Sequence, residues 1–186
     1  MKKALFVLAI TLLTSGSSFA QLVTNGGFET GTFDGWTQFG NTAFTDPNGT
    51  PNTGRFGADF GPTTYTGGSG GIQQTIATCA GCTYTLDFFM ANGGGTPSSV
   101  NVSFGGLTLF SATDEDGYRY TEFTFTGLVV GNNATLMFDF LHDPDYYYLD
   151  DVTVTLTETP EPGSLALLGS GMLGLGGAIR RKLIAR

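Results

Sequence analysis

Few side chains in the sequence have the chemistry of a catalytic nucleophile or base, and the most distinctive are two cysteines and one histidine. Cys79 and Cys82 are the only cysteines of the chain and are separated by two residues. A single Cys-x-x-Cys pair lacks the second pair that a zinc site needs and the βαβ context of a redox motif. His142 is the only histidine, and no nucleophile-elbow motif accompanies it. We therefore predict a loop histidine and no Ser-His-Asp or Cys-His catalytic site.

The remaining candidate groups are carboxylates, which dominate the charge of the central part of the chain. Between residues 21 and 159 there are 15 Asp and Glu residues against two basic ones, Arg55 and Arg119, a formal charge of 2 − 15 = −13. Nucleic acids and anionic lipids would be repelled, because their binding relies on clustered Lys and Arg. Calcium and neutral sugars remain compatible partners. A pair of carboxylates can also hydrolyse glycosidic bonds, so a polysaccharide hydrolase stays an alternative.

The first twenty residues have the layout of a secretory signal peptide. A positively charged start precedes an apolar run over residues 4–13, and Ser18 and Ala20 supply the small residues of a cleavage site. The run is too short to cross ~30 Å of hydrocarbon. We expect residues 1–20 to be removed and the mature chain to begin at Gln21. An exported protein meets oxidising conditions, so Cys79 and Cys82 are predicted to form a small disulfide that closes a turn between two strands.

A second apolar segment lies near the C-terminus. Residues 164–179 are apolar, include five glycines and are followed by Arg180-Arg181-Lys182. As a helix this segment would reach only ~24 Å, whereas a permanent anchor usually has about 20 apolar residues. We predict a short transmembrane segment over 164–179, with its basic end in the cytoplasm and the body of the protein outside. Its shortness and glycine content are typical of a tail that is recognised and then processed.

Three ordered elements at this end resemble a known sorting signal. Pro160-Glu161-Pro162, the short apolar segment and the basic Arg180-Arg181 together resemble a PEP-CTERM sorting signal, a region also called the ice-binding protein C-terminal domain. The resemblance implies that residues 159–186 are recognised by an exosortase-type membrane protease and cleaved near the Pro-Glu-Pro motif. It also implies a Gram-negative bacterium with an exopolysaccharide or biofilm matrix, and a protein of the cell envelope, cell surface or extracellular space.

Residues 21–158 between these signals are predicted to form one all-β domain. Apolar and polar residues alternate with period two in several short segments, which indicates strands with one buried face. These segments lie at about 84–90, 100–104, 107–110, 121–126, 136–140 and 146–156. Gly105-Gly106 predicts a hairpin. No segment shows a helical period, and the recurrent turns favour an antiparallel β-sandwich or jelly roll.

Short motifs at the two ends of this domain narrow the fold further. Asn25-Gly26-Gly27-Phe28-Glu29 stands near its start and Leu149-Asp150-Asp151-Val152 near its end. The pair resembles the opening and closing strands of galactose-binding-like jelly rolls, the fold of many carbohydrate-binding modules. In those folds the two strands are neighbours, and a structural calcium often lies between them. The resemblance implies Glu29 and Asp151 as calcium ligands, completed by backbone carbonyls of residues 51–59. The alternative is that both are ordinary solvated residues.

Exposed aromatic rings are the sequence's only pointer to a ligand. A flat π-face matches the C–H face of a pyranose, but most aromatic residues are buried in cores, so no ring is assigned to a binding site. The candidates are Trp36, Tyr65, Tyr118, Tyr120, Tyr146, Tyr147 and Tyr148. We expect an exported, non-enzymatic protein that binds or organises polysaccharide. A structural or adhesion protein of the matrix that binds no glycan is the alternative, with the hydrolase less favoured.

Overall fold

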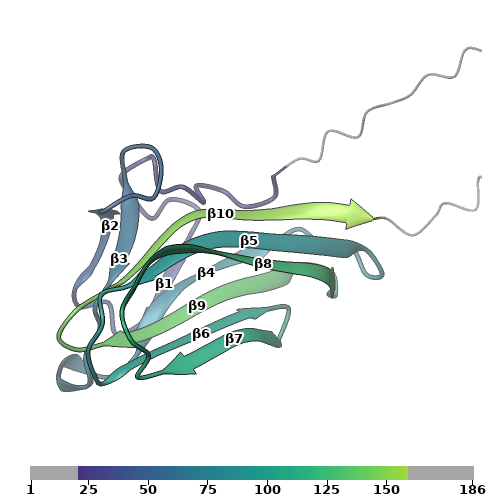
Figure 1. Ribbon diagram of the computed structural model, residues 1–186. Helices are drawn as coiled ribbons and strands as arrows, with labels where there is room; N and C mark the ends of the chain where they lie inside the picture. The colour runs from purple at the N-terminus through teal and green to yellow at the C-terminus, as the bar shows by residue number, and fades with distance from the viewer. Residues whose placement is uncertain (1–20, 159–186) are drawn as a thin grey trace, which may run out of the picture.

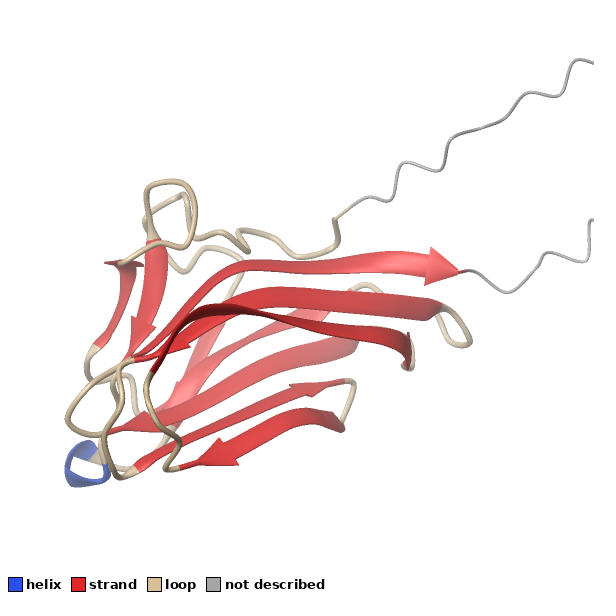
Figure 2. Cartoon of the chain, viewed as in Figure 1, coloured by secondary structure: helices blue, strands red, loops and turns tan. Residues whose placement is uncertain are grey.

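Two antiparallel sheets packed face to face make up residues 21–158, the part of the chain that the computed structural model describes (Figures 1 and 2). The predicted signal peptide (1–20) and sorting tail (159–186), with its predicted transmembrane segment over 164–179, lie outside these residues. Within the described residues, no helix has the length and apolar character needed to cross a bilayer.

The strands alternate with short connections and one 3-10 turn, η1 (Thr64–Thr66). They are β1 (Thr37–Gly40), β2 (Thr45–Gly49), β3 (Gly57–Phe60), β4 (Gly70–Ile76), β5 (Thr83–Asn92), β6 (Ser98–Phe104), β7 (Leu107–Thr113), β8 (Tyr118–Val129), β9 (Ala134–His142) and β10 (Tyr147–Glu158). One sheet has the order β1-β4-β9-β6-β7 and the other β2-β3-β10-β5-β8, with antiparallel neighbours throughout. The predicted antiparallel β-sandwich is confirmed.

Inward-facing aromatic residues of β3, β5 and β9 fill much of the space between the sheets. Phe88 of β5 meets Phe138 of β9 edge to face, with ring centroids 5.1 Å apart. Phe60 of β3 stacks on Phe140 of β9 at 4.5 Å. All four rings are fully buried. Aromatic residues of this size dominate the apolar area that a core removes from water, so these contacts hold the two sheets together.

The N-terminal segment of the described chain lies along β10. Leu22 donates its backbone N–H to the Val154 carbonyl at 3.0 Å, and Val152 donates to the Gly26 carbonyl at 2.9 Å. A side chain at position 26 would collide with the Val152 carbonyl, so only glycine permits this approach. The first and last segments are therefore neighbours as expected. The first segment forms an isolated bridge, Gln21 with Thr155, instead of a regular strand.

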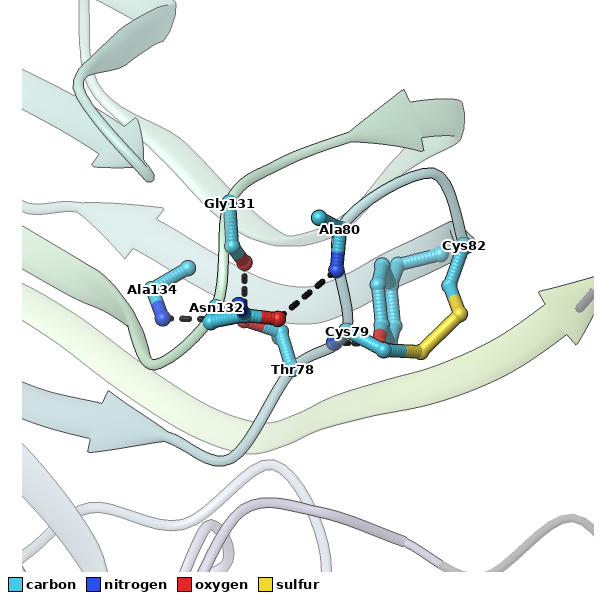
Figure 3. Close-up of a disulfide and its surroundings, with 8 residues drawn as sticks. Thr78, Cys79, Ala80, Cys82, Gly131, Asn132 and Ala134 are labelled. Atoms are coloured by element: carbon cyan, nitrogen blue, oxygen red, sulfur yellow. Dashed lines mark hydrogen bonds between the residues drawn. A yellow bond between two sulfur atoms is a disulfide. The ribbon is translucent and has the colours of Figure 1, made fainter.

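A disulfide between Cys79 and Cys82 closes the connection from β4 to β5 (Figure 3). Their Cα atoms are 5.5 Å apart, and the Cys79 N–H donates to the hydroxyl of the buried Tyr84 at 2.7 Å. Next to it, the Thr78 hydroxyl donates to the Gly131 carbonyl at 2.6 Å and accepts from the Ala134 N–H at 2.9 Å. The disulfide loop is thus joined to the loop that precedes β9.

The two ends of the sandwich carry different parts of the chain. At one end β10 finishes at Glu158, beside the start of the described chain, and the loop with the disulfide lies at this same end (Figure 1). At the opposite end lie the connections β5–β6, β7–β8 and β9–β10. Any ligand held by those connections would be one strand length away from the point where the chain leaves toward its tail.

Candidate functional site

A groove of about 540 Å³ lies where β10, β5 and β8 approach that opposite end. We call it the tyrosine groove. It is lined by Thr50, Ala91, Asn92, Gly93, Tyr118, Arg119, Tyr120 and Tyr148. Three tyrosines and one of the two arginines of the central domain therefore meet in one concave surface, a combination typical of ligand sites.

Strand irregularity and one loop position the rings of the groove. The pairing of β5 with β8 shifts register between Met90 and Asn92, and such bulges re-aim the side chains beside them. The Tyr120 hydroxyl donates to the Thr50 carbonyl at 2.7 Å, which joins β8 to the loop over residues 50–56. Tyr148 stands on β10, opposite Ala91 of β5. Residues more than 25 positions apart in the chain thus form the two walls.

The hydroxyl groups of the groove stay protonated at ordinary pH. Burial and the neighbouring Asp145 carboxylate together raise the pKa of Tyr148 to about 12. Burial also raises the pKa of Tyr120, with added contributions from Asp150 and Asp59. The Tyr120 and Tyr148 hydroxyls donate to the Thr50 carbonyl and the Asp145 carboxylate, so their oxygens can accept hydrogen bonds from sugar hydroxyls.

A buried polar network supports the groove from beneath. The side-chain oxygen of Asn92 accepts from the Gly94 N–H at 2.9 Å and lies 2.7 Å from Nε2 of His142. His142 Nδ1 accepts from the Asp145 N–H at 3.2 Å, so the proton is on Nε2 and the ring is neutral. Burial lowers the pKa of His142. The prediction of a loop histidine is wrong: His142 ends β9, is fully buried and joins three connections.

The predicted calcium ligands stand beside the loop over residues 50–56. Glu29 accepts the backbone N–H groups of Arg55 and Phe56, at 2.9 and 3.1 Å. Asp151 accepts from the Asn52 side-chain amide at 2.9 Å and the Thr53 hydroxyl at 2.8 Å. The structure thus brings both predicted residues onto one loop, although that loop directs N–H groups toward Glu29.

Sequence reasoning missed the most buried carboxylate of this region, Asp150. It is fully buried and accepts the backbone N–H groups of Asn52, Thr53 and Asp151 at 2.8, 3.1 and 2.7 Å. Burial raises the pKa of Asp150 to about 6, although these hydrogen bonds act in the opposite direction. Its position in an Asp-Asp pair gives no signal of which member points inward, since the strand has a bulge there.

The negative charge around Glu29, Asp150 and Asp151 suits a divalent cation, but the placement of these carboxylates suits it only in part. Every donor named for Glu29, Asp150 and Asp151 is a backbone N–H or a neutral side chain, so no basic group balances three carboxylates. Among residues 21–158, no set of three Asp, Glu, His or Cys side chains is placed to share one metal ion. A calcium ion here would need two carboxylates supplemented by neutral oxygens, which calcium accepts.

The outer face of the other sheet offers a contrast. Cross-strand neighbours there form a row of Phe39, Gly71, Asp139, Asn101 and Ser111. Ser69 donates to the Asp139 carboxylate at 3.3 Å, and burial raises the pKa of Asp139. Small and polar side chains dominate this row, and tyrosines are concentrated on the sheet that holds β10. We therefore place the candidate site in the tyrosine groove.

One family model matches the chain. Residues 158–182 match the PEP-CTERM protein-sorting motif, which indicates a secreted protein sorted to the cell envelope. The match contains Pro160, Glu161, Pro162, Arg180 and Arg181, the residues predicted to carry the signal. No curated protein matches the sequence.

The described domain is similar in fold to solved carbohydrate-binding modules and to an adhesin domain. TmCBM61, solved with β-1,4-galactotriose, has 19% identity and a TM-score of 0.58, with 74% of this chain and 99% of that chain covered. The family 22 module of Clostridium thermocellum Xyn10B has 14% identity and a TM-score of 0.54, covering 74% and 94%. The K3 adhesin domain of Lys-gingipain from Porphyromonas gingivalis has 12% identity and a TM-score of 0.56, covering 74% and 99%. At these identities the likeness concerns the fold.

A pH titration tests the environment of Asp59, which accepts a backbone hydrogen bond from Thr50 at the start of the loop over residues 50–56. Burial raises the pKa of Asp59 to about 6 from 3.8, so between those values the folded protein binds a proton that the unfolded chain has released. The contribution of Asp59 to stability therefore falls as pH rises from about 4 to about 6. We expect Asp59→Asn to raise the melting temperature at pH 7, with the gain vanishing toward pH 4. Melting curves in EDTA measure this, and a gap independent of pH would contradict it.

Proposed function

We propose that this exported protein binds polysaccharide without catalysis, through the tyrosine groove, and reaches the envelope by exosortase-type processing of its tail. The groove itself carries the proposal: aromatic faces, phenolic hydroxyls and one guanidinium line a single hollow of about 540 Å³. Tyr and Arg are the residue types most enriched at binding hot spots. A sugar presents both an apolar C–H face and hydroxyl groups, and this lining meets both needs.

The chemistry of the lining favours binding over hydrolysis. Glycosidases place two carboxyl groups about 5–10 Å apart across the scissile bond. None of the eight residues that line the tyrosine groove is Asp, Glu, His or Cys. Of the carboxylates beside the groove, Asp145 accepts from the Tyr148 hydroxyl at 3.2 Å, and the fully buried Asp150 has its oxygens occupied by backbone N–H groups. This supports a non-enzymatic role.

The position of the groove suits a protein handled through its C-terminus. The described chain leaves the sandwich at Glu158, at the far end of β10 from Tyr148 (Figure 1). The ten residue steps from Tyr148 to Glu158 would span about 33 Å at 3.3 Å per residue. A sorting intermediate held by its tail would thus carry the groove on its outer side, free to bind an exopolysaccharide.

Binding to a panel of neutral, amino and acidic polysaccharides tests the proposal. We expect retention of at least one glycan, and Tyr120→Ala and Tyr148→Ala should each weaken it about 30-fold, the loss expected for a hot-spot residue worth about 2 kcal/mol. Affinity electrophoresis of the mature chain measures this. Tyr65→Ala is the matched control, since Tyr65 is 96% exposed and lies outside the groove. Self-association without glycan retention would favour the structural or adhesion alternative.

We further propose a structural calcium ion held by Glu29 and Asp151 with backbone oxygens of residues 51–59. The unbalanced negative charge of this region supports it. Such an ion would fasten the loop that receives the Tyr120 hydroxyl through Thr50, and so would steady one wall of the groove.

Calcium should therefore stabilise the fold. At 100 times its dissociation constant the ion would add about 2.7 kcal/mol, or a rise on the order of 8 °C in melting temperature for a domain of this size. Glu29→Ala and Asp151→Ala should each abolish the rise, and Asp34→Ala, an exposed carboxylate change, should preserve it. Identical melting of the wild-type protein in calcium and in EDTA would remove the site.

Processing at the C-terminus is testable by mass. If an exosortase-type protease cleaves near Pro160-Glu161-Pro162, the mature protein from the native host lacks residues 164–186. Replacing Pro160, Glu161 and Pro162 with alanine should leave an uncleaved form, heavier by the tail, in the membrane fraction. Intact mass spectrometry of both forms measures this, and a wild-type protein that keeps its C-terminal Arg186 would refute the processing.

A further inference from the structure

A second hollow lies on the same face, next to the tyrosine groove. Its volume is about 330 Å³, and Phe44, Asp46, Asp59 and Tyr146 are among its walls. We call it the Phe44 hollow. An adjoining depression of about 200 Å³ shares Phe44 and Tyr146 with it. The ring of Tyr146 lies 6.3 Å from that of Tyr148, which lines the tyrosine groove, so the two sites meet at this pair of rings.

Phe44 is placed as a binding residue would be. Its side chain is 58% exposed, and its backbone has φ +57°, a conformation uncommon for a bulky residue. The Phe44 carbonyl accepts the Gly61 N–H at 3.0 Å, which holds the turn. Strained backbone of this kind clusters at ligand sites. Burial in the core therefore does not explain this ring.

Gly61 makes room for the second ring of the hollow. A Cβ atom at this position would lie 2.7 Å from Cε1 of Tyr146, closer than carbon atoms approach, so any side chain would displace the tyrosine. The backbone of Tyr146 is fixed as well, because its N–H donates to the Asp145 carboxylate at 2.8 Å. The local backbone thus positions both aromatic rings that line the hollow.

The charge of the Phe44 hollow restricts its ligand. Asp46 and Asp59 stand directly opposite each other on β2 and β3, and no lysine or arginine lines either part of the hollow. The exposed Asp46 carboxylate would accept a hydrogen bond from a hydroxyl or ammonium group of a ligand, whereas a ligand carboxylate would be repelled. Ammonium groups are also attracted to aromatic faces.

We infer that Phe44 and Tyr146 form a second sugar subsite, continuous with the tyrosine groove, that takes neutral or amino sugars and rejects uronic acids. This inference rests on the function proposed above and specifies its substrate: an extended chain that crosses both hollows. A ligand of one or two sugars would occupy the tyrosine groove alone.

The test compares chain lengths and charges with the full-length protein in mild detergent. The probes are β-1,4-galactan, xylan and chitosan, their disaccharides, and the uronic polymers polygalacturonate and alginate. We expect Phe44→Ala and Tyr146→Ala each to weaken binding of the retained polymer about tenfold. The affinity for the corresponding disaccharide should stay within twofold of the wild-type value. Asp46→Asn should increase retention of polygalacturonate at low salt, where charge repulsion is least screened.

Controls separate this subsite from the groove. Tyr65→Ala should match the wild type, and melting curves of every variant check that the fold is intact. Unchanged polymer binding in Phe44→Ala and Tyr146→Ala, with loss in Tyr120→Ala, would overturn the second subsite and leave the groove standing. Preferential retention of the uronic polymers would overturn the charge selection. Retention of no probe by the wild type would refute the proposed function and this subsite with it.

Discussion

The structure depends on β10 being paired along both of its edges. One edge pairs with β5 along its length, and the other meets β3 at its start and the chain's first residues near its end. The pairing with β5 has a bulge between Asp150 and Thr153, at the point where the other edge passes from β3 to the N-terminal segment. The left-handed φ of +52° at Asp151 and the close approach of Gly26 both belong to this crossing.

The same crossing explains why carboxylates gather there. Asp150 turns into the fold and Asp151 outward, and the loop over residues 50–56 closes on both with N–H and hydroxyl donors. Burying a carboxylate is costly unless hydrogen bonds replace its water, and neutral donors leave the charge itself unbalanced. A divalent cation would balance this negative charge. The proposed calcium ion would therefore stabilise the contact between the first and last segments of the sandwich and would take no part in chemistry on a ligand.

From β10 the consequences extend to the binding surface. Tyr148 lies in the regular part of β10 that precedes the bulge. The Tyr120 hydroxyl bonds to the loop over residues 50–56, which the carboxylates hold. The neutral His142 and Asn92 fix the connections beneath the groove. The rings therefore rest on strands and a buried polar network. Pre-ordered aromatic surfaces lose little entropy when a ligand binds, and this surface stands at the end of the sandwich away from the tail.

The sequence by itself determined the C-terminal sorting motif and the fold class. Alternation in β5 and β9 was readable because one face of each strand is buried, and the Pro-Glu-Pro tail because its elements are contiguous. The short motifs at the two ends of the domain also singled out Glu29 and Asp151, which the structure brings beside one loop. Only the tertiary structure decided the rest. The short strands β1, β2 and β3 lack a clear period, His142 lies in the core, and Asp150 is the buried member of its pair. The groove joins Thr50, Asn92, Tyr120 and Tyr148, which no local pattern connects, because contacts across about 100 residues are set by strand order and register.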